Sequence, residues 1–221
     1  MIDLHTHSIH SDGDLIPAEL VQRAKAKGYR VIAITDHSDE SNLETVISSL
    51  KKFALGLPKD PAITVLFGVE LTHLYPVQIP KMVKAARRLG AEVVVIHGET
   101  IVEPVPKGTN RAGIEAGADI IAHPGLIELE EVKLAAEKGV FLEITTRLGH
   151  SLSNGRVAAL AREAKAGLAL NTDSHAPEDL TGREDAKKIA QASGLTGSEI
   201  SRMFSNSESL VKKILARRKK R

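Results

Sequence analysis

The sequence feature that most restricts the fold is a repeated alternation of short apolar runs with longer amphipathic stretches. Runs such as VIAIT, VVVI and DIIA are apolar at successive positions, the pattern of a strand covered on both faces. The intervening stretches space their apolar residues near the helical period. Seven strands are expected, at residues 2–5, 31–35, 63–69, 93–97, 120–123, 140–144 and 168–171. Seven strand–helix units in one chain predict an α/β fold with a parallel sheet.

Glycine, proline and polar residues mark the ends of the expected helices, which include 18–27, 79–89, 130–138 and 156–165. Pro17 suits a first helical turn, and Ser41 or Asn42 suits the N-cap of the helix that follows. A glycine in a left-handed conformation often ends a helix. Such glycines are expected before five strands, at Gly28, Gly90, Gly117, Gly139 and Gly167.

Composition narrows the class of protein. The 221 residues are expected to form a single domain, because no linker or low-complexity stretch divides them. The absence of cysteine excludes disulfides, thiolate zinc sites and cysteine nucleophiles. No apolar run is long enough for a membrane span. Because the chain is polar by residue 3, no signal peptide is expected, and a cytoplasmic location is predicted.

The charge is unevenly distributed along the chain. Residues 212–221 hold seven of the 30 basic side chains and no acidic one, so the rest of the chain carries a net charge of −5. A basic cluster can contact nucleic acid phosphates. Here, however, Leu210, Val211, Ile214 and Leu215 lie on one helical face. A final packing helix at about 206–217 with a solvated basic tail at 217–221 is therefore expected, and nucleic acid is not the expected partner.

Imidazole and carboxylate side chains gather at the carboxyl ends of the expected strands. Six of the nine histidines take part. The residues are His5, His7, Asp12, His37, Glu70, His97, His123, Asp173 and His175. An open sheet and a closed barrel both fit the alternation of elements. Convergence of side chains from many strand ends is typical of a barrel. An open nucleotide-binding sheet usually has a G-x-G-x-x-G motif after its first strand, and this sequence has none there.

These nine residues predict a metal centre. His5 and His7 are two apart on a strand and therefore point to the same side, and Asp173 and His175 repeat this spacing. Nitrogen and carboxylate ligands without sulfur suit Zn²⁺, Mn²⁺ or Fe²⁺ rather than calcium. Nine ligands are too many for one ion, so two or three divalent ions are expected. Such clusters hydrolyse phosphate esters.

The ordered motifs HTH, SDG, TDH, GVE, IHGE, AHPG and TDSH resemble those of the PHP (polymerase and histidinol phosphatase) domain family, from residue 3 to about 176. The resemblance implies a distorted seven-stranded, TIM-like (β/α) barrel. It also implies how the ligands divide. One ion would be held by His5, His7 and Asp173. Glu70 would bridge it to a second ion held by His97 and His123. A third would be held by Asp12, His37 and His175.

Residues beside the ligands are candidates for handling protons and substrate. A metal-activated hydroxide would attack phosphorus, and Asp12 and Asp173 are candidates for moving protons. Arg147 has the planar fork that suits phosphate, and His150 and Lys107 are further candidate substrate contacts. Carboxylates that orient the ligands are expected among Asp3, Asp36 and Glu99. His10 and His73 are expected to be surface or structural residues.

The leading hypothesis is hydrolysis of a small phosphomonoester, as in histidinol phosphatases, because the chain is short and its body is acidic. The alternatives are a nuclease or nucleotide phosphatase and, from a different class, an RNA-binding PHP-fold subunit without catalysis. Metal-dependent C–N hydrolysis ranks below these, because no lysine stands at a strand end to serve as a carboxylated ligand. The small phosphorylated metabolite itself and the oligomeric state are left open.

Overall fold

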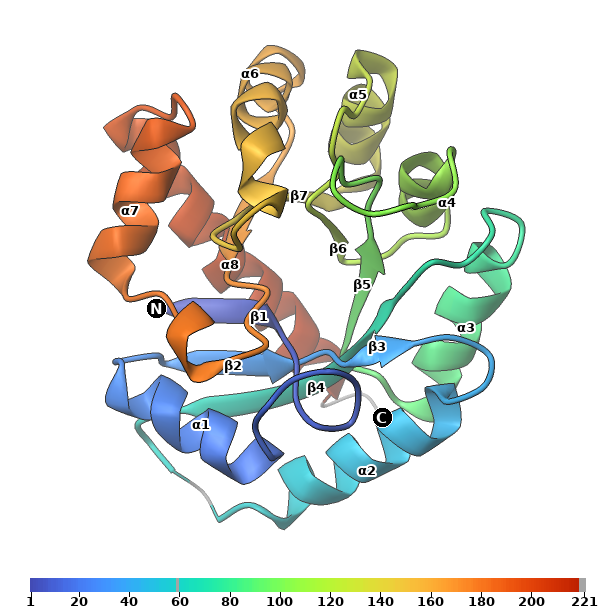
Figure 1. Cartoon of the computed structure of the whole chain (residues 1–221), viewed down its shortest axis with the longest axis vertical. Helices are drawn as coiled ribbons and strands as arrows, with labels where there is room; N and C mark the ends of the chain where they lie inside the picture. The colour runs from blue at the N-terminus through green and yellow to red at the C-terminus, as the bar shows by residue number, and fades with distance from the viewer. Residues whose placement is uncertain (59, 219–221) are drawn as a thin grey trace.

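The computed structural model describes residues 1–58 and 60–218. A parallel sheet forms the centre, and helices surround it (Figure 1). The strands are β1 (Ile2–Thr6), β2 (Val31–Ile34), β3 (His37–Ser38), β4 (Thr64–Leu71), β5 (Val93–His97), β6 (Ile120–Ala122), β7 (Phe141–Thr145) and β8 (Leu168–Asn171). The seven expected strands are thus present, and β3 is an unexpected two-residue strand that pairs with β4.

The α-helices follow the expected alternation. They are α1 (Pro17–Ala26), α2 (Leu43–Gly56), α3 (Ile79–Leu89), α4 (Thr109–Glu115), α5 (Leu129–Lys138), α6 (Asn154–Ala164), α7 (Arg183–Ala192) and α8 (Gly197–Arg218). Short 3-10 helices lie at η1 (His150–Ser153) and η2 (Pro177–Asp179). In the part of the chain that is described, no helix is both long and apolar enough to cross a membrane.

The sheet is almost closed into the expected distorted barrel. Its strands run in the order β1-β2-β4-β5-β6-β7-β8, all parallel. Between β8 and β1 a single bridge, Thr6 to Ser174, replaces a full ladder. Side chains join this seam: the Leu4 N–H donates to the Asn171 Oδ1 at 2.9 Å, and the Thr172 hydroxyl donates to Asp3 at 2.6 Å. Asp3 therefore holds the seam together, and the barrel fold is confirmed.

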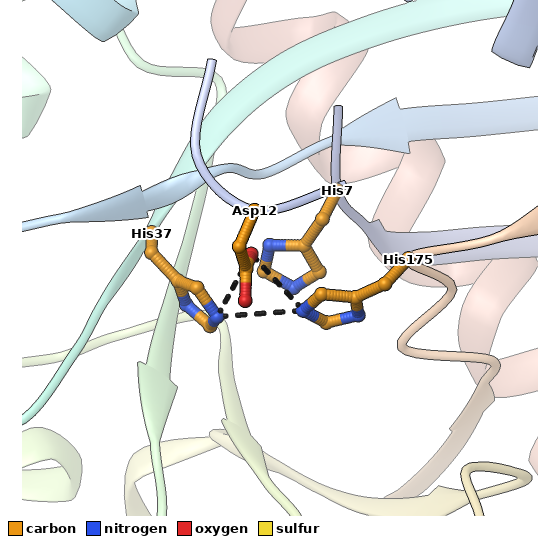
Figure 2. Close-up of side chains that lie close together, drawn as sticks. All are labelled: His7, Asp12, His37 and His175. Carbon is orange, nitrogen blue, oxygen red and sulfur yellow. Dashed lines mark hydrogen bonds and ion pairs between the residues drawn. The ribbon is translucent and has the colours of Figure 1, made fainter. Parts of the chain in front are cut away.

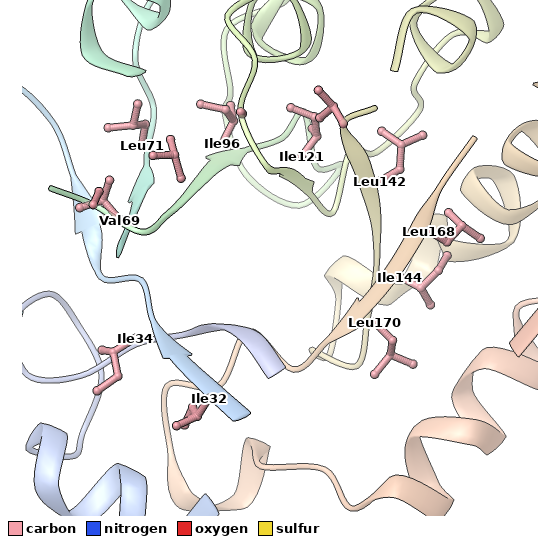
Figure 3. Close-up of a cluster of buried hydrophobic side chains, with 14 of the residues drawn as sticks. Ile32, Ile34, Val69, Leu71, Ile96, Ile121, Leu142, Ile144, Leu168 and Leu170 are labelled. Atoms are coloured by element: carbon pink, nitrogen blue, oxygen red, sulfur yellow. The ribbon is translucent and has the colours of Figure 1, made fainter. Parts of the chain in front are cut away.

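Two apolar layers give the barrel its stability. Outward-facing residues such as Ile32, Ile34 and Ile96 pack against the surrounding helices (Figure 3). The alternate residues face inward at the amino end of the barrel, where they form a smaller cluster. This inner cluster includes Leu4, Ala33, Leu66, Val95, Ile120 and Ala122, together with Leu210, Val211 and Ile214 from α8. Helix α8 thus closes the amino end of the barrel.

Several predicted helix ends need correction. Four expected glycines have left-handed backbones, but before β8 it is Lys165, at φ 56°, that takes this conformation. Gly167 is required for space instead, because a Cβ there would lie 2.8 Å from the Phe141 ring. Asn42 stands at the N-cap of α2, yet its side chain makes no capping bond and donates to the His37 carbonyl at 3.0 Å.

The final helix also differs from the expectation. α8 begins at Gly197 rather than near 206, because its first turns bury Ile200 and Met203 against the protein. The start of the basic tail is partly exposed, but its charges are paired: Arg217 pairs with Asp119 at 2.9 Å, and Arg218 pairs with Glu92. Residues 219–221 of the predicted tail lie outside the described residues.

Candidate metal centre

The alternation of side chains along each strand brings the expected ligands into the barrel. On β4, Leu66 faces the inner apolar cluster, so Glu70, four residues later, faces the same interior at the carboxyl end. On β5, Val95 belongs to the same cluster and His97 follows two residues later. The barrel interior therefore changes from apolar at one end to charged at the other.

All nine expected ligands meet at this carboxyl end. They form overlapping groups in which one potential ligand atom per residue lies within 4.8 Å of the others. The groups are His5, His123 and Asp173; His5, His7 and Glu70; Glu70, His97 and His123; and His7, Asp12, His37 and His175. Glu70 is the one carboxylate of the nine that belongs to two of these groups.

The most open group is drawn in Figure 2, where His7, His37 and His175 surround the Asp12 carboxylate. The Nε2 atoms of His175 and His37 lie 3.2 and 3.4 Å from the Asp12 Oδ1. Asp12 is on the loop after β1, which Asp36 anchors by accepting bonds from the Ser8 N–H and from the Ser11 hydroxyl at 2.8 Å. Asp36 thus orients a ligand through its loop.

The other ligands are buried around Glu70. The His5 Nε2 lies 3.2 Å from one Glu70 oxygen, and the His37 Nδ1 lies 2.6 Å from the other. The His7 Nε2 lies 3.2 Å from the Asp173 Oδ1. Asp173 and His123 have positive φ angles of 53° and 23°, which cost non-glycine residues on the order of 1–3 kcal/mol. Strained backbone of this kind gathers at functional sites.

Four buried atoms of the centre fit a metal ion. Among the described residues, the Glu70 Oε1, His97 Nδ1, His123 Nδ1 and Asp173 Oδ1 have no hydrogen-bond partner. A buried polar atom without a partner is costly, on the order of 1–3 kcal/mol each. Glu70, His97 and His123 belong to one group of potential ligands, and Asp173 shares another group with His123. A divalent cation would satisfy them together.

The electrostatics of the centre favour the neutral form at two of its histidines, whereas neighbouring carboxylates, against the effect of burial, raise the pKa of His5, His37 and His97. Burial, reinforced by the neighbouring His37 and His175, holds the pKa of His7 well below its usual value. Burial likewise lowers the pKa of His123. Neutral imidazole is the form that binds a metal. Burial raises the pKa of Asp173 to about 7, with Glu70 adding to the effect against the opposing pull of His5. Positive charge in this space would keep Asp173 ionised.

Sequence reasoning missed Glu143, which lies inside β7 rather than at its end. It is fully buried and accepts a hydrogen bond from the His5 Nδ1 at 2.9 Å. It also accepts from the His123 N–H at 3.0 Å and from the Asn171 amide at 2.8 Å. The one available signal was a carboxylate within the otherwise apolar run FLEIT. Such carboxylates orient metal-bound imidazoles.

Glu103, in the loop after β5, was also missed. Its oxygens lie 3.0 Å from the His97 Nε2, 3.2 Å from the His73 Nε2 and 3.4 Å from the His150 Nε2. Contact with His97 lowers the pKa of Glu103 to about 2. His73, expected at the surface, is partly exposed but packs beside His97 with ring centroids 4.8 Å apart. His97, His73 and Glu103 form a fifth group of potential ligand atoms.

The candidate substrate residues lie in different places. Arg147 is beside the centre and donates to the Asp173 carbonyl and to Asp179, both at 3.1 Å. His150 is buried, stacks on His123 at 4.2 Å and bonds the Thr100 hydroxyl at 2.7 Å. Lys107 is exposed and lines a cavity of about 430 Å³ to which none of the nine ligands contributes.

Glu99 does not contact the imidazoles as expected. Its Oε1 accepts from the N–H groups of Gly108 and Asn110 at 2.9 and 3.0 Å, so it orders the turn that begins α4. His10, expected at the surface or in a structural role, is half-buried on the loop after β1, where its N–H donates to the Ser8 hydroxyl at 3.3 Å.

Comparison with known sequences agrees with these motifs. A family model described as the PHP domain matches residues 3–98. The chain is 51% identical over 201 residues to an uncharacterized protein of Methanocaldococcus jannaschii, covering 90% of this chain and 92% of that one. It is 26% identical to a probable phosphatase of a Thermoanaerobacter species, covering 89% and 87%. It is 27% identical to ribonuclease P protein component 3 of Methanosarcina barkeri, covering 89% and 82%.

Solved structures share the fold. Histidinol phosphate phosphatase of Lactococcus lactis, solved with zinc, L-histidinol and phosphate, has a TM-score of 0.61 at 17% identity, covering 88% of this chain and 94% of that chain. A chain of an archaeal ribonuclease P solved with mature tRNA has a TM-score of 0.71 at 16% identity, covering 96% and 90%. With the motif set, the barrel and these relatives in agreement, the chain belongs to the PHP family.

Proposed function

We propose that this protein is a metal-dependent phosphoesterase that hydrolyses a small phosphomonoester at a centre of two or three divalent ions. The observation that carries the proposal is the convergence of nine histidine and carboxylate side chains in overlapping groups, with a suitable residue at every position. The likeness to a probable phosphatase and to a histidinol phosphate phosphatase supports a hydrolase. The ligand atoms, all nitrogen or oxygen, suit Zn²⁺, Mn²⁺ or Fe²⁺.

The ligands have distinct roles in this proposal. When bound, the ions would lower the pKa of a water molecule and neutralise phosphate oxygens. Asp12 is the only exposed member of the nine, which supports a role for its carboxylate in accepting a proton from the attacking water. Asp173 is buried and holds its place at the centre, where it is the second candidate for moving a proton. Glu70 joins two of the groups.

Arg147 is our candidate for binding the phosphate. Its Nη1 is already fixed by the Asp173 carbonyl and by Asp179, which aims the guanidinium at the edge of the centre. Its Nε also lies 3.7 Å from the Asp173 Oδ2, and the side chain is partly exposed, so the outer edge of the guanidinium is our candidate for meeting phosphate oxygens in a paired geometry. His150 is buried and stacks on His123, so it would contact the substrate only at the buried side of the centre.

An RNA-binding subunit is the second candidate, because of the likeness to ribonuclease P component 3. Two features of this chain favour catalysis instead. The first is the full set of nine ligand-type residues, which RNA binding alone does not require. In addition, Arg217 and Arg218 are engaged with Asp119 and Glu92, so their charges contribute to the fold.

Phosphate release tests the proposal. The protein reconstituted with Mn²⁺ or Zn²⁺ is assayed against phosphomonoesters including histidinol phosphate, against nucleoside bisphosphates and against short RNA. We expect one small phosphomonoester to be hydrolysed fastest and His97→Ala to abolish the release. Hydrolysis of RNA alone would replace the proposal with a nuclease. Tight tRNA binding without any hydrolysis would replace it with the binding subunit.

A further inference from the structure

The loop after β5 places one carboxylate against three imidazoles. The Glu103 Oε2 lies 3.0 Å from the His97 Nε2 and 3.2 Å from the His73 Nε2. The Glu103 Oε1 lies 3.4 Å from the His150 Nε2. An ionised carboxylate can only accept hydrogen bonds. The His97 nitrogen that faces Glu103 therefore carries a proton.

The other nitrogen of His97 is left without a partner. The His97 Nδ1 is buried, and no described residue forms a hydrogen bond with it. A neutral imidazole protonated at Nε2 has a lone pair at Nδ1. His97 also belongs to the group formed with Glu70 and His123. The unpartnered lone pair thus belongs to a side chain that already lies among potential metal ligands.

We propose that Glu103 is a positioning residue that holds His97 in the Nε2-protonated form and so makes Nδ1 the metal-binding atom. The inference rests on the proposed function in one respect only, that the centre binds a divalent cation. Glu103 itself would remain outside the coordination shell.

His5 also contacts a carboxylate through one ring nitrogen, but the roles of its two nitrogens are exchanged. Its Nδ1 donates to Glu143 at 2.9 Å, which leaves the Nε2 facing Glu70 at 3.2 Å. One carboxylate from a strand and one from a loop would thus set opposite tautomers within a single centre. Carboxylate partners of this kind raise the basicity of the ligand and fix the direction of its ring.

Further contacts fix the loop although Glu103 is 39% exposed. The Thr100 hydroxyl bonds the His150 Nδ1 at 2.7 Å. A Cβ on Gly149 would lie 3.7 Å from a Val102 methyl group, so the loops after β5 and β7 are in contact. His73, which adds the third bond to Glu103, has a positive φ of 53°. The carboxylate is thus held from three sides.

The test combines nitrogen NMR with metal affinity. In the full-length protein labelled with ¹⁵N-histidine, the ring signals of His97 are identified by their loss in His97→Gln. In the metal-free protein we expect the proton on Nε2, and on adding Zn²⁺ we expect the Nδ1 signal to shift. By chelator competition, Glu103→Ala should weaken Zn²⁺ binding roughly 10- to 100-fold, the effect of removing such a partner. Glu103→Gln, which keeps an acceptor oxygen, should recover part of the loss.

Glu137→Ala is the matched control, because Glu137 is an exposed glutamate on α5 and is in none of the candidate metal groups. It should leave both the Zn²⁺ affinity and the NMR spectrum unchanged. Coordination through the His97 Nε2, or unchanged Zn²⁺ affinity in Glu103→Ala, would overturn the inference. Failure of phosphate release with Nδ1 coordination intact would refute the proposed function alone, so the two failures are distinguishable.

Discussion

The two ends of the barrel are built from the same strands but are completed in different ways. At the amino end, inward-facing residues such as Leu66 and Val95 pack on Leu210 and Ile214 of α8. At the carboxyl end, the same strands deliver Glu70 and His97, and buried atoms there have no hydrogen-bond partner among the described residues. The amino end is closed by the chain itself, whereas the carboxyl end keeps ligand-type atoms that a bound cation would satisfy.

The buried charged groups at the two ends also differ in how they are paired. At the amino end, the buried Asp119 is paired with Arg87 at 2.5 Å and with Arg217 at 2.9 Å. At the carboxyl end, anionic and imidazole groups crowd together, and burial holds the pKa of both His7 and His123 below the usual range. The residues that stabilise the barrel and those of the candidate metal centre are thus separated along the barrel axis, as is typical of barrel enzymes.

The largest expected effect comes from Glu70→Gln, which removes charge from the carboxyl end without changing the side-chain volume. We expect phosphate release to fall by about 10³-fold, roughly 4 kcal/mol of transition-state stabilisation, because two groups lose their shared carboxylate. Elemental analysis of the dialysed protein should show less than the wild-type number of ions. Circular dichroism of the metal-free variant checks that the barrel is retained. A variant with full metal content and full activity would contradict the role given to Glu70.

Ile214→Ala makes the reciprocal change at the amino end. Ile214 is a buried residue of α8 that belongs to the inner apolar cluster. Its truncation should therefore lower the free energy of unfolding by about 2–5 kcal/mol. Urea denaturation measures the loss, and Lys213→Ala, an exposed neighbour on α8, should change it by about 0.5 kcal/mol or less. Metal content should stay at the wild-type level. A loss of metal with the loss of stability would mean that the two ends are coupled.

The fold was predictable because its main signal is local. Apolar runs of strand length and helical spacing are properties of consecutive residues, so the seven main strands and the parallel sheet followed from them. Closure into a barrel was indicated separately, by the polar residues at the strand ends and by the family resemblance. The errors arose where a distant residue decides the structure. Gly167 is needed because of the Phe141 ring, not for its backbone angle. The early start of α8 depends on Ile200 and Met203 being covered by the rest of the protein.

The candidate site, too, was predicted where the signal is local and missed where distant residues meet. The nine expected ligands stand at strand ends, and parallel strands bring their carboxyl ends together, so their convergence was predictable. Glu143 and Glu103 were missed because each acts on a histidine far away in the sequence. Lys107 stays a prediction: the loop after β5 turns Glu103 toward the histidines, and Lys107 lines a cavity to which none of the nine ligands contributes.

The smallest expected effect is the increase in the free energy of unfolding that a bound metal ion gives. A ligand that binds only the folded state stabilises it by RT ln(1 + [L]/Kd), so Zn²⁺ at ten times its Kd should add about 1.4 kcal/mol per ion. Thermal or urea unfolding with and without a chelator measures this increment. Ile214→Ala should keep the increment, since its change lies at the amino end, and Glu70→Gln should lose most of it. If Glu70→Gln kept the full increment, the ions that stabilise the protein would lie outside the carboxyl end, and the division between the two ends would fail.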